Sequence, residues 1–211
     1  MTLQIAWFVL VGMLFTGYAV LDGFDLGVGF WHPFAKKDEE RRLFIKAIGP
    51  VWDGNEVWLL TAGGALFAAF PPVYASVFSG FYLAMMLVLF GLIFRASALE
   101  FRHQVDSPGW KRAWDMAFHV GSTLPALLYG VAVGNLVRGL QLNEAGDYIG
   151  GFFALLNPYA LVVGLTGLAM FVVHGALYLT VKTESELADK TRSWASKAWF
   201  AFASLFVVTA V

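Results

Sequence analysis

Four carboxylates stand inside apolar stretches of the chain, where an ionised side chain is costly. They are Asp22 and Asp25 within residues 5–30, and Asp53 and Glu56 within residues 50–70. Acids at membrane depth are rare and commonly mark proton or ion pathways, so each needs a partner. Both pairs have an i,i+3 spacing, which places the two members on one face of a helix. The chemistry that this pattern favours is a proton relay.

Two structural interpretations compete with the proton relay. Acids in the first turn of a helix stabilise it through the helix dipole, which fits Asp53 and Asp115 at the start of their apolar runs. Capping does not fit Asp22 and Asp25, which come late in theirs. Arg95 closes a further apolar run at the same expected depth, so an ion pair with Arg95 is the main competitor. The five acids and Arg95 are therefore predicted to converge and are the candidate proton-path residues.

Composition indicates a membrane protein. Hydrophobic residues make up 59% of the 211 residues and charged residues 14%, whereas soluble domains average roughly 45–50% and about 25%. The net charge of −1 argues against a nucleic-acid partner. The chain has no cysteine, which excludes cysteine-bound zinc, iron–sulfur clusters and c-type haem attachment in these residues.

The apolar runs predict an all-α, polytopic transmembrane helix bundle that forms a single domain over residues 1–211. A membrane helix needs about 20 apolar residues. The predicted complete spans are 4–31, 51–70, 73–94, 114–136 and 153–181, and a partial sixth runs from Trp194 to Val211. Pro71 and Pro72 leave almost no loop between the second and third spans, which predicts that these two form an antiparallel hairpin.

Charge asymmetry between the loops predicts the orientation. Thirteen of the fourteen Lys and Arg residues fall in segments 31–50, 95–113 and 182–197, which are alternate connections. The positive-inside rule assigns these segments to the cytoplasm. The N-terminus, the Pro71 turn and the loop that carries Arg138 are then expected outside.

The histidines do not form a recognisable haem-ligand pair. His32 and His103 are expected in or near cytoplasmic loops, in contact with solvent. His119 and His174 are expected at membrane depth, where an interhelical hydrogen bond is favoured over haem ligation. No catalytic residue, cofactor ligand or metal ligand is predicted in this chain.

Two motifs make the chain recognisable. The segments DGFDLGVG at 22–29 and PVWDGNEVWLLTAGGALFAA at 50–69 resemble subunit II of the cytochrome bd-type quinol oxidases. Trp114-Asp115, Gly134-Asn135-Leu136 and Leu156-Asn157-Pro158 continue the resemblance in order, so that it covers essentially the whole chain.

The resemblance implies a non-haem subunit of a respiratory oxidase that oxidises quinol and reduces dioxygen to water. It places haem b and haem d in the partner, subunit I, which this subunit would help to assemble. By position, Asp53 matches an acid associated with the proton route and Trp58 a tryptophan associated with the oxygen channel. A small single-span accessory subunit, membrane lipid and quinone are further expected partners, in the cytoplasmic membrane of a bacterium or archaeon.

Two features depart from the family pattern. Family members are longer and have more spans, whereas this chain stops inside the sixth. Glu56 also occupies a position where the best-known member has glutamine.

Two other functions stay open: a proton-coupled transporter that uses the same acids, and a purely structural membrane scaffold. The acids lie toward one membrane face and no internal repeat is evident, which weighs against a transporter.

Overall fold

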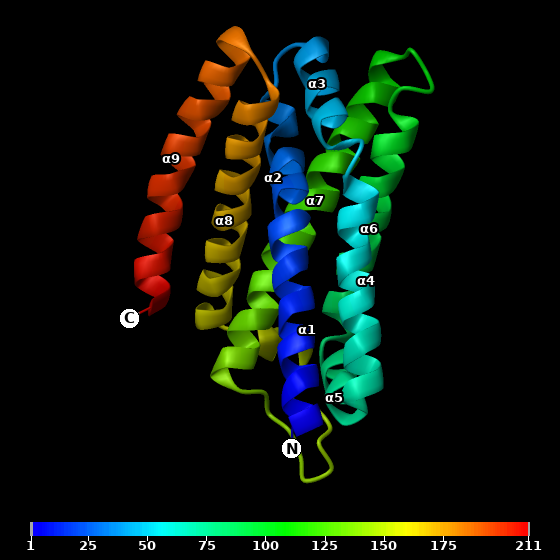
Figure 1. Cartoon of the computed structure of the whole chain (residues 1–211), viewed down its shortest axis with the longest axis vertical. Coiled ribbons are helices and arrows are strands. Elements are labelled where there is room, and N and C mark those ends of the chain that lie inside the picture. Colours follow the sequence, from blue (N-terminus) through cyan, green and yellow to red (C-terminus); the bar gives the residue numbers. More distant parts are fainter. Residues whose placement is uncertain (1, 211) are drawn as a thin grey trace.

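The structure is a computed structural model that describes residues 2–210, which are helical apart from short connections and one isolated bridge between Leu142 and Tyr148 (Figure 1). The helices are α1 (Thr2–Leu21), α2 (Gly23–Trp31), α3 (Asp38–Ile48), α4 (Trp52–Ala69), α5 (Pro71–Gly80), α6 (Tyr82–Phe101), α7 (Pro108–Arg138), α8 (Pro158–Lys182) and α9 (Ser185–Ala210), with 3-10 turns η1 (His32–Phe34) and η2 (Phe152–Leu156). The predicted all-α class is confirmed.

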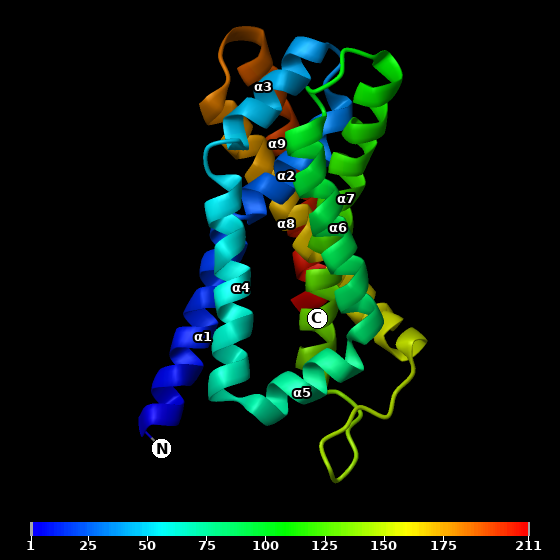
Figure 2. The same cartoon turned by 90° about the vertical axis from the view of Figure 1, so that its right-hand side faces the viewer.

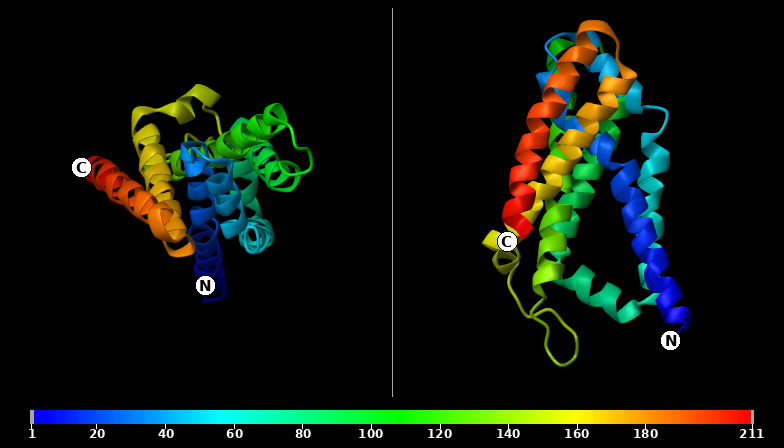
Figure 3. Two further views of the ribbon diagram at one scale, coloured as in Figure 1. Left: turned by 90° about the horizontal axis from the view of Figure 1, so that it is seen from above. Right: turned by 60° about the vertical axis from the view of Figure 1, so that its left-hand side comes forward.

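Helices α2, α6, α7 and α8 pack together as the centre of the bundle, and α9 packs along α8. Helix α1 pairs instead with α4, and the two diverge from α6, α7 and α8 toward the end of the molecule that holds the N-terminus (Figures 2 and 3). The three cation-rich segments lie together at the opposite end (Figure 1).

Four helical segments are long and apolar enough to cross a membrane. They are Thr2–Phe34, Tyr82–Phe101, Pro108–Arg138 and Pro158–Lys182. Helices α4 and α9 coincide in part with two predicted spans but do not belong to this group, because polar residues crowd their N-terminal turns. A multi-pass membrane protein follows from the four; the count of five and a partial sixth stays a prediction.

The predicted span 73–94 and its hairpin with 51–70 are wrong. The chain forms two helices there, α5 and α6, separated at Phe81, whose backbone (φ −95°, ψ 16°) is not helical. Prolines at the first two positions start α5, where they need no backbone partner. Helix α5 then crosses sideways from α4 to α6 (Figure 2). Apolar composition is continuous through this bend, so hydropathy could not reveal it.

The predicted span 4–31 is interrupted at Asp22, between α1 and α2. Asp25 consequently lies in the first turn of α2, rather than late in a long helix as the sequence suggested. The hydrogen bonds from the Asp22 amide to the Tyr18 carbonyl and from the Leu26 amide to the Asp22 carbonyl continue through the junction. The two helices thus form one bent segment with the acids at its bend.

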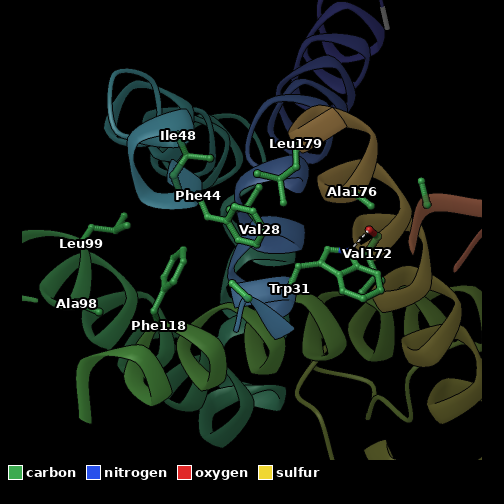
Figure 4. Close-up of a cluster of buried hydrophobic side chains, with 12 residues drawn as sticks. Val28, Trp31, Phe44, Ile48, Ala98, Leu99, Phe118, Val172, Ala176 and Leu179 are labelled. Atoms are coloured by element: carbon green, nitrogen blue, oxygen red, sulfur yellow. Dashed lines mark hydrogen bonds between the residues drawn. The ribbon is translucent and has the colours of Figure 1, made fainter. Parts of the chain in front are cut away.

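The main hydrophobic core lies at the end that holds α3 (Figure 4). Its buried members are Val28, Trp31, Ala35, Phe44, Ile48, Ala98, Leu99, Phe118, Val172, Ala176, Leu179 and Ala195. Within it, Nε1 of Trp31 donates to the carbonyl of Val172 at 2.8 Å. This core joins α3 to the bundle and leaves the α1–α4 pair outside.

Glycine lets α2 and α8 approach closely, since a Cβ on Gly27 would collide with the Phe171 carbonyl and the Gly175 backbone. The glycines of α4 differ. A Cβ on Gly54, Gly63 or Gly64 would meet nothing within 4 Å, so these glycines do not serve close packing within residues 2–210.

Candidate functional site

A buried ion cluster, here called the Arg95 cluster, consists of Asp22, Asp25, Asn55, Glu56 and Arg95. The guanidinium of Arg95 donates to both oxygens of Asp22, at 2.8 and 2.7 Å, and to Oε2 of Glu56 at 2.5 Å. Asp22, Asp25 and Arg95 are fully buried, and the Glu56 side chain is 18% exposed. Three helical segments that are distant in sequence therefore meet at one cation.

Asn55 connects the second acid of α2 to the cluster. Its Nδ2 donates to Oδ2 of Asp25 at 2.8 Å and to the Leu21 carbonyl at 2.9 Å. The latter bond satisfies a carbonyl at the α1–α2 bend, which explains why a polar residue is needed in the first turn of α4. Oδ1 of Asp25 remains buried without a hydrogen-bond partner among residues 2–210.

The charge count of this cluster suits proton binding. The cluster contains three carboxyl groups, two of them bonded to its single guanidinium, so it becomes neutral only when it holds two protons. An uncompensated charge in a low-dielectric interior is strongly unfavourable. The arrangement can thus take up and release protons as the charge of its surroundings changes.

Asp115 does not join the Arg95 cluster but forms a second one, the Asp115 cluster, with His32, Asp38, Arg41 and Arg102. Asp115 lies 2.6 Å from Nε2 of His32, 2.8 Å from Arg41 Nη1 and 2.5 Å from Arg102 Nε. His32 is fully buried, so the expectation that it is solvated is wrong. The 3-10 turn after α2 directs its ring into the interface with α7 rather than into the loop.

The outer part of the Asp115 cluster attaches α3 to the bundle. Arg102 donates to Oδ1 of Asp38 at 2.6 Å, and this hydrogen bond lowers the pKa of the Asp38 carboxyl. Lys190 of α9 donates to Glu40 at 2.8 Å in the same way. Acids in the first turn of α3 are thereby paired with cations from α6 and α9.

The structure separates Asp53 from the other candidates. Asp53 is exposed in the first turn of α4 and makes no hydrogen bond or ion pair with any residue in 2–210. Of the five acids, Asp53 and Asp115 therefore make no direct contact with the Arg95 cluster among residues 2–210. Trp58 is 38% exposed and its ring lies against Gly17 of α1.

Several site residues were missed by sequence reasoning. Asn55 lies inside the second motif, Arg41 and Arg102 lie among the cations of the charged segments, and His32 is expected in contact with solvent, so the sequence pattern singles out none of them. The available signal was the spacing of Asp25 and His32, which is two helical turns. Of the other histidines, His103 is exposed, and His119 makes an interhelical hydrogen bond to the Phe30 carbonyl at 3.0 Å.

The residues described here offer no metal site. In the range 2–210, no three His, Asp or Glu side chains gather in an arrangement that could hold a metal ion.

Comparison with known proteins identifies the family. The family model described as cytochrome bd terminal oxidase subunit II matches residues 3–211. The chain belongs to this family. Subunit II of the cytochrome bd-I ubiquinol oxidase of Escherichia coli K12 is 47% identical over 201 residues, which is 93% of this chain and 53% of that protein. The resemblance noted in the sequence is confirmed.

Other members of the subunit II family agree. The probable cytochrome oxidase subunit 2 of Haemophilus influenzae is 50% identical over 90% of this chain, and the cytochrome bd ubiquinol oxidase subunit 2 of Bacillus subtilis is 40% identical over 90%. The chain spans 52% and 57% of those two proteins, about half of their length.

The fold of this subunit II family member matches a solved structure. The bd oxidase of Geobacillus thermodenitrificans superposes with a TM-score of 0.81 at 16% identity, over all of this chain and 64% of that one. At this identity the likeness concerns the fold alone.

Proposed function

We propose that this chain is part of a membrane subunit of a cytochrome bd-type terminal oxidase, and that it carries protons toward the haem-bearing subunit. The Arg95 cluster supports this proposal, because Asp22 and Glu56 both bond to one buried guanidinium and a third acid, Asp25, joins them through Asn55. A purely structural ion pair would need one acid, and the two extra acids give the cluster its capacity for protons.

The complex would oxidise quinol and reduce dioxygen to water, with haem b and haem d bound by subunit I. Two features support a partner at α4. Its glycines have open space beside them, and large apolar side chains on its surface are exposed, among them Val57, Leu60 and Phe67. A helix face with small residues and open space beside it among residues 2–210 is suited to close contact with another membrane helix.

Asp53 and Trp58 fit this contact face. Asp53 is unpaired and exposed at the α4 end that the positive-inside rule assigns to the cytoplasm. We propose that it takes up protons at the boundary with subunit I, and that Trp58 lines oxygen access there. The same proposal includes five spans and a partial sixth, an outward N-terminus, the bacterial cytoplasmic membrane and a small accessory subunit.

The test is purification of the complex through a tag on this subunit, followed by its optical spectrum and its quinol-dependent oxygen consumption. Bands of b- and d-type haem should co-purify. Asp25→Asn and Asp53→Asn should each lower turnover about tenfold or more, since a positioned proton-transfer group contributes roughly 10²–10⁴-fold. Asp53→Glu should retain more activity than Asp53→Asn, with the haems assembled in every variant.

Asp189→Asn is the matched control, because Asp189 is exposed and pairs only with Arg192. Purification without haem, together with solute uptake in vesicles, would contradict the oxidase function. Wild-type turnover in both Asn variants would reduce the acids to structural groups.

A further inference from the structure

Five buried polar atoms without a hydrogen-bond partner, here called the file, lie on the segments that hold the two ion clusters. Within residues 2–210, Oδ1 of Asp25, Nδ1 of His32, Nε of Arg95 and Oγ of Ser122 are buried without a hydrogen-bond partner, and Oγ1 of Thr123 is the fifth such atom. Leaving a buried polar group unpaired costs about 1–3 kcal/mol. Such groups are normally bonded to each other or to internal water, so their concentration on α2, α6 and α7 calls for a function.

Two members of the file, Asp25 and His32, lie in line with Gly29 along α2 and the 3-10 turn that follows it. Asp25, Gly29 and His32 follow the i, i+4, i+7 spacing of one helix face. Ser122 fills the space beside Gly29, because a Cβ on Gly29 would collide with its hydroxyl. The file therefore covers about 10 Å along the helix axis, at 1.5 Å per residue, with Ser122 between the two ionisable groups.

Arg95, on α6, lies next to the row formed by Asp25, Ser122 and His32. The backbone of Arg95 packs against Gly121, the neighbour of Ser122, so α6 and α7 are in close contact at this level. At the Arg95 cluster, the file therefore ends at Asp25 and at the guanidinium of Arg95, which bonds to Asp22 and Glu56.

The opposite end of the file opens to solvent. A pocket of about 350 Å³ lies between α3, α7 and the α6–α7 turn, lined mainly by charged side chains that include Arg41, Lys111 and Asp115. Asp115 forms part of its wall and contacts His32 directly. The pocket is at the end that the positive-inside rule assigns to the cytoplasm.

We propose that His32 is the relay of a second proton uptake route, which leads from this pocket through Asp115, His32 and Ser122 to the Arg95 cluster. Asp115 passes a proton to Nε2 of His32, and Nδ1 releases a proton toward Ser122, where internal water carries it on to Asp25. The ring gains one proton at Nε2 and loses one at Nδ1. Exchange between the two neutral tautomers then returns the ring to its initial state. The route rests on the proposed function, and its source of protons is separate from Asp53.

Histidine is suited to this position because both ring nitrogens can exchange protons near neutral pH. The charged groups that face the ring come from α3, α6 and α7 and are Arg41, Arg102 and Asp115. Phe118 covers the ring edge-on at 5.1 Å. The two guanidinium groups bond to Asp115 rather than to Nδ1, which leaves that nitrogen available to the file.

The deciding variant is His32→Gln in the purified complex. A glutamine amide can still donate to Asp115, so a structural role survives, but it cannot be protonated at neutral pH. Turnover should fall about tenfold, less than the roughly hundredfold of an indispensable proton-transfer group, because the Asp53 route remains. The solvent deuterium isotope effect on turnover should rise while the haem spectrum and the quinol KM stay unchanged.

His119→Gln is the matched control, since His119 bonds only to backbone carbonyls, and it should behave as wild type. Ser122→Ala is the second arm. It removes a hydroxyl that has no partner, so stability should be kept, and turnover should fall with the same rise in isotope effect. This arm decides the matter if His32→Gln fails to assemble.

Wild-type turnover and isotope effect in both His32→Gln and Ser122→Ala would overturn the second route. If Asp25→Asn and Asp53→Asn are slow in the same assay, the proposed proton-carrying function stands without it. If those variants are also unaffected, that function fails as well. A fall in turnover that only tracks lost haem would make His32 structural and overturn the proposal.

Discussion

At the residue scale, the partner of each acid decides what that acid can do. Asp22 is held by two hydrogen bonds from Arg95, whereas Asp25 keeps one oxygen unpaired and Asp53 contacts nothing in residues 2–210. These three acids lie in neighbouring helices at a similar depth. They range from an acid held by a guanidinium to one with no hydrogen-bond partner among the described residues.

Breaking the buried pair is expected to be costly. Arg95→Gln leaves Asp22 and Glu56 without their cation, and removal of one partner of a buried ion pair costs about 3–5 kcal/mol. The free energy of unfolding, measured by SDS titration in mixed micelles, should fall by this amount. In Asp22→Asn plus Arg95→Gln the combined loss should be smaller than the sum of the single losses. Strict additivity would show that the two side chains do not interact.

At the element scale, the small residues of α2 and α4 have opposite surroundings. Gly27 sits where α2 meets the backbone of α8, and Gly63 on α4 has open space beside it. The sequence gives both the same appearance, that of a glycine in an apolar helix. Their difference shows which helix face is completed within residues 2–210 and which is left open there.

Replacement of each glycine by alanine separates these two roles. Gly27→Ala should lower the free energy of unfolding by about 1–3 kcal/mol, because backbone atoms cannot move aside as a flexible side chain can. Gly63→Ala should leave it unchanged or raise it by up to about 1 kcal/mol through helix propensity. Gly63→Ala should nevertheless reduce co-purification with the haem subunit. Equal stability losses in the two variants would contradict the assignment of an open face to α4.

At the scale of the whole molecule, α3 lies across the cation-rich end, and the α1–α4 pair and the bundle diverge toward the opposite end (Figure 2). Helix α3 is attached through Phe44 and Ile48 in the core and through Asp38–Arg102 and Glu40–Lys190 at the surface. The α1–α4 pair is joined to α6 by the ion pair between Glu56 and Arg95, and beyond that level it diverges from the bundle toward α5 (Figure 2). The rigid end therefore carries the Asp115 cluster and its pocket.

The attachment of α3 should weaken in acid. The hydrogen bond from Arg102 holds the pKa of Asp38 below its ordinary value of 3.8. A lowered folded-state pKa means that the contact stabilises the fold fully above about pH 4 and is lost as pH falls through the lowered value. The cysteine-free chain accepts a unique spin label at Leu43→Cys on α3, whose mobility should rise below about pH 4. In Asp38→Asn the label should be more mobile than in the parent at neutral pH and should lose its pH dependence; a label as rigid as in the parent there would assign the attachment to the apolar core and the other ion pairs of α3.

The sequence alone determined the helical class, the membrane environment, the family and the identities of the acids, because these follow from composition, local periodicity and motifs. It also placed the cations of the three charged segments at one end. It did not show the separation of α5 from α6, since apolar residues continue through that bend.

Only the tertiary structure decided which acids share Arg95, that Asp53 stays apart, and that Asp115 and His32 form a second buried cluster. Helical spacing fixes the face that a side chain occupies along its own helix. The partner across the interface depends on the close approach of α2 to α7 and α8 and on the bend at Asp22. Those are set by long-range packing, which no local pattern in the chain encodes.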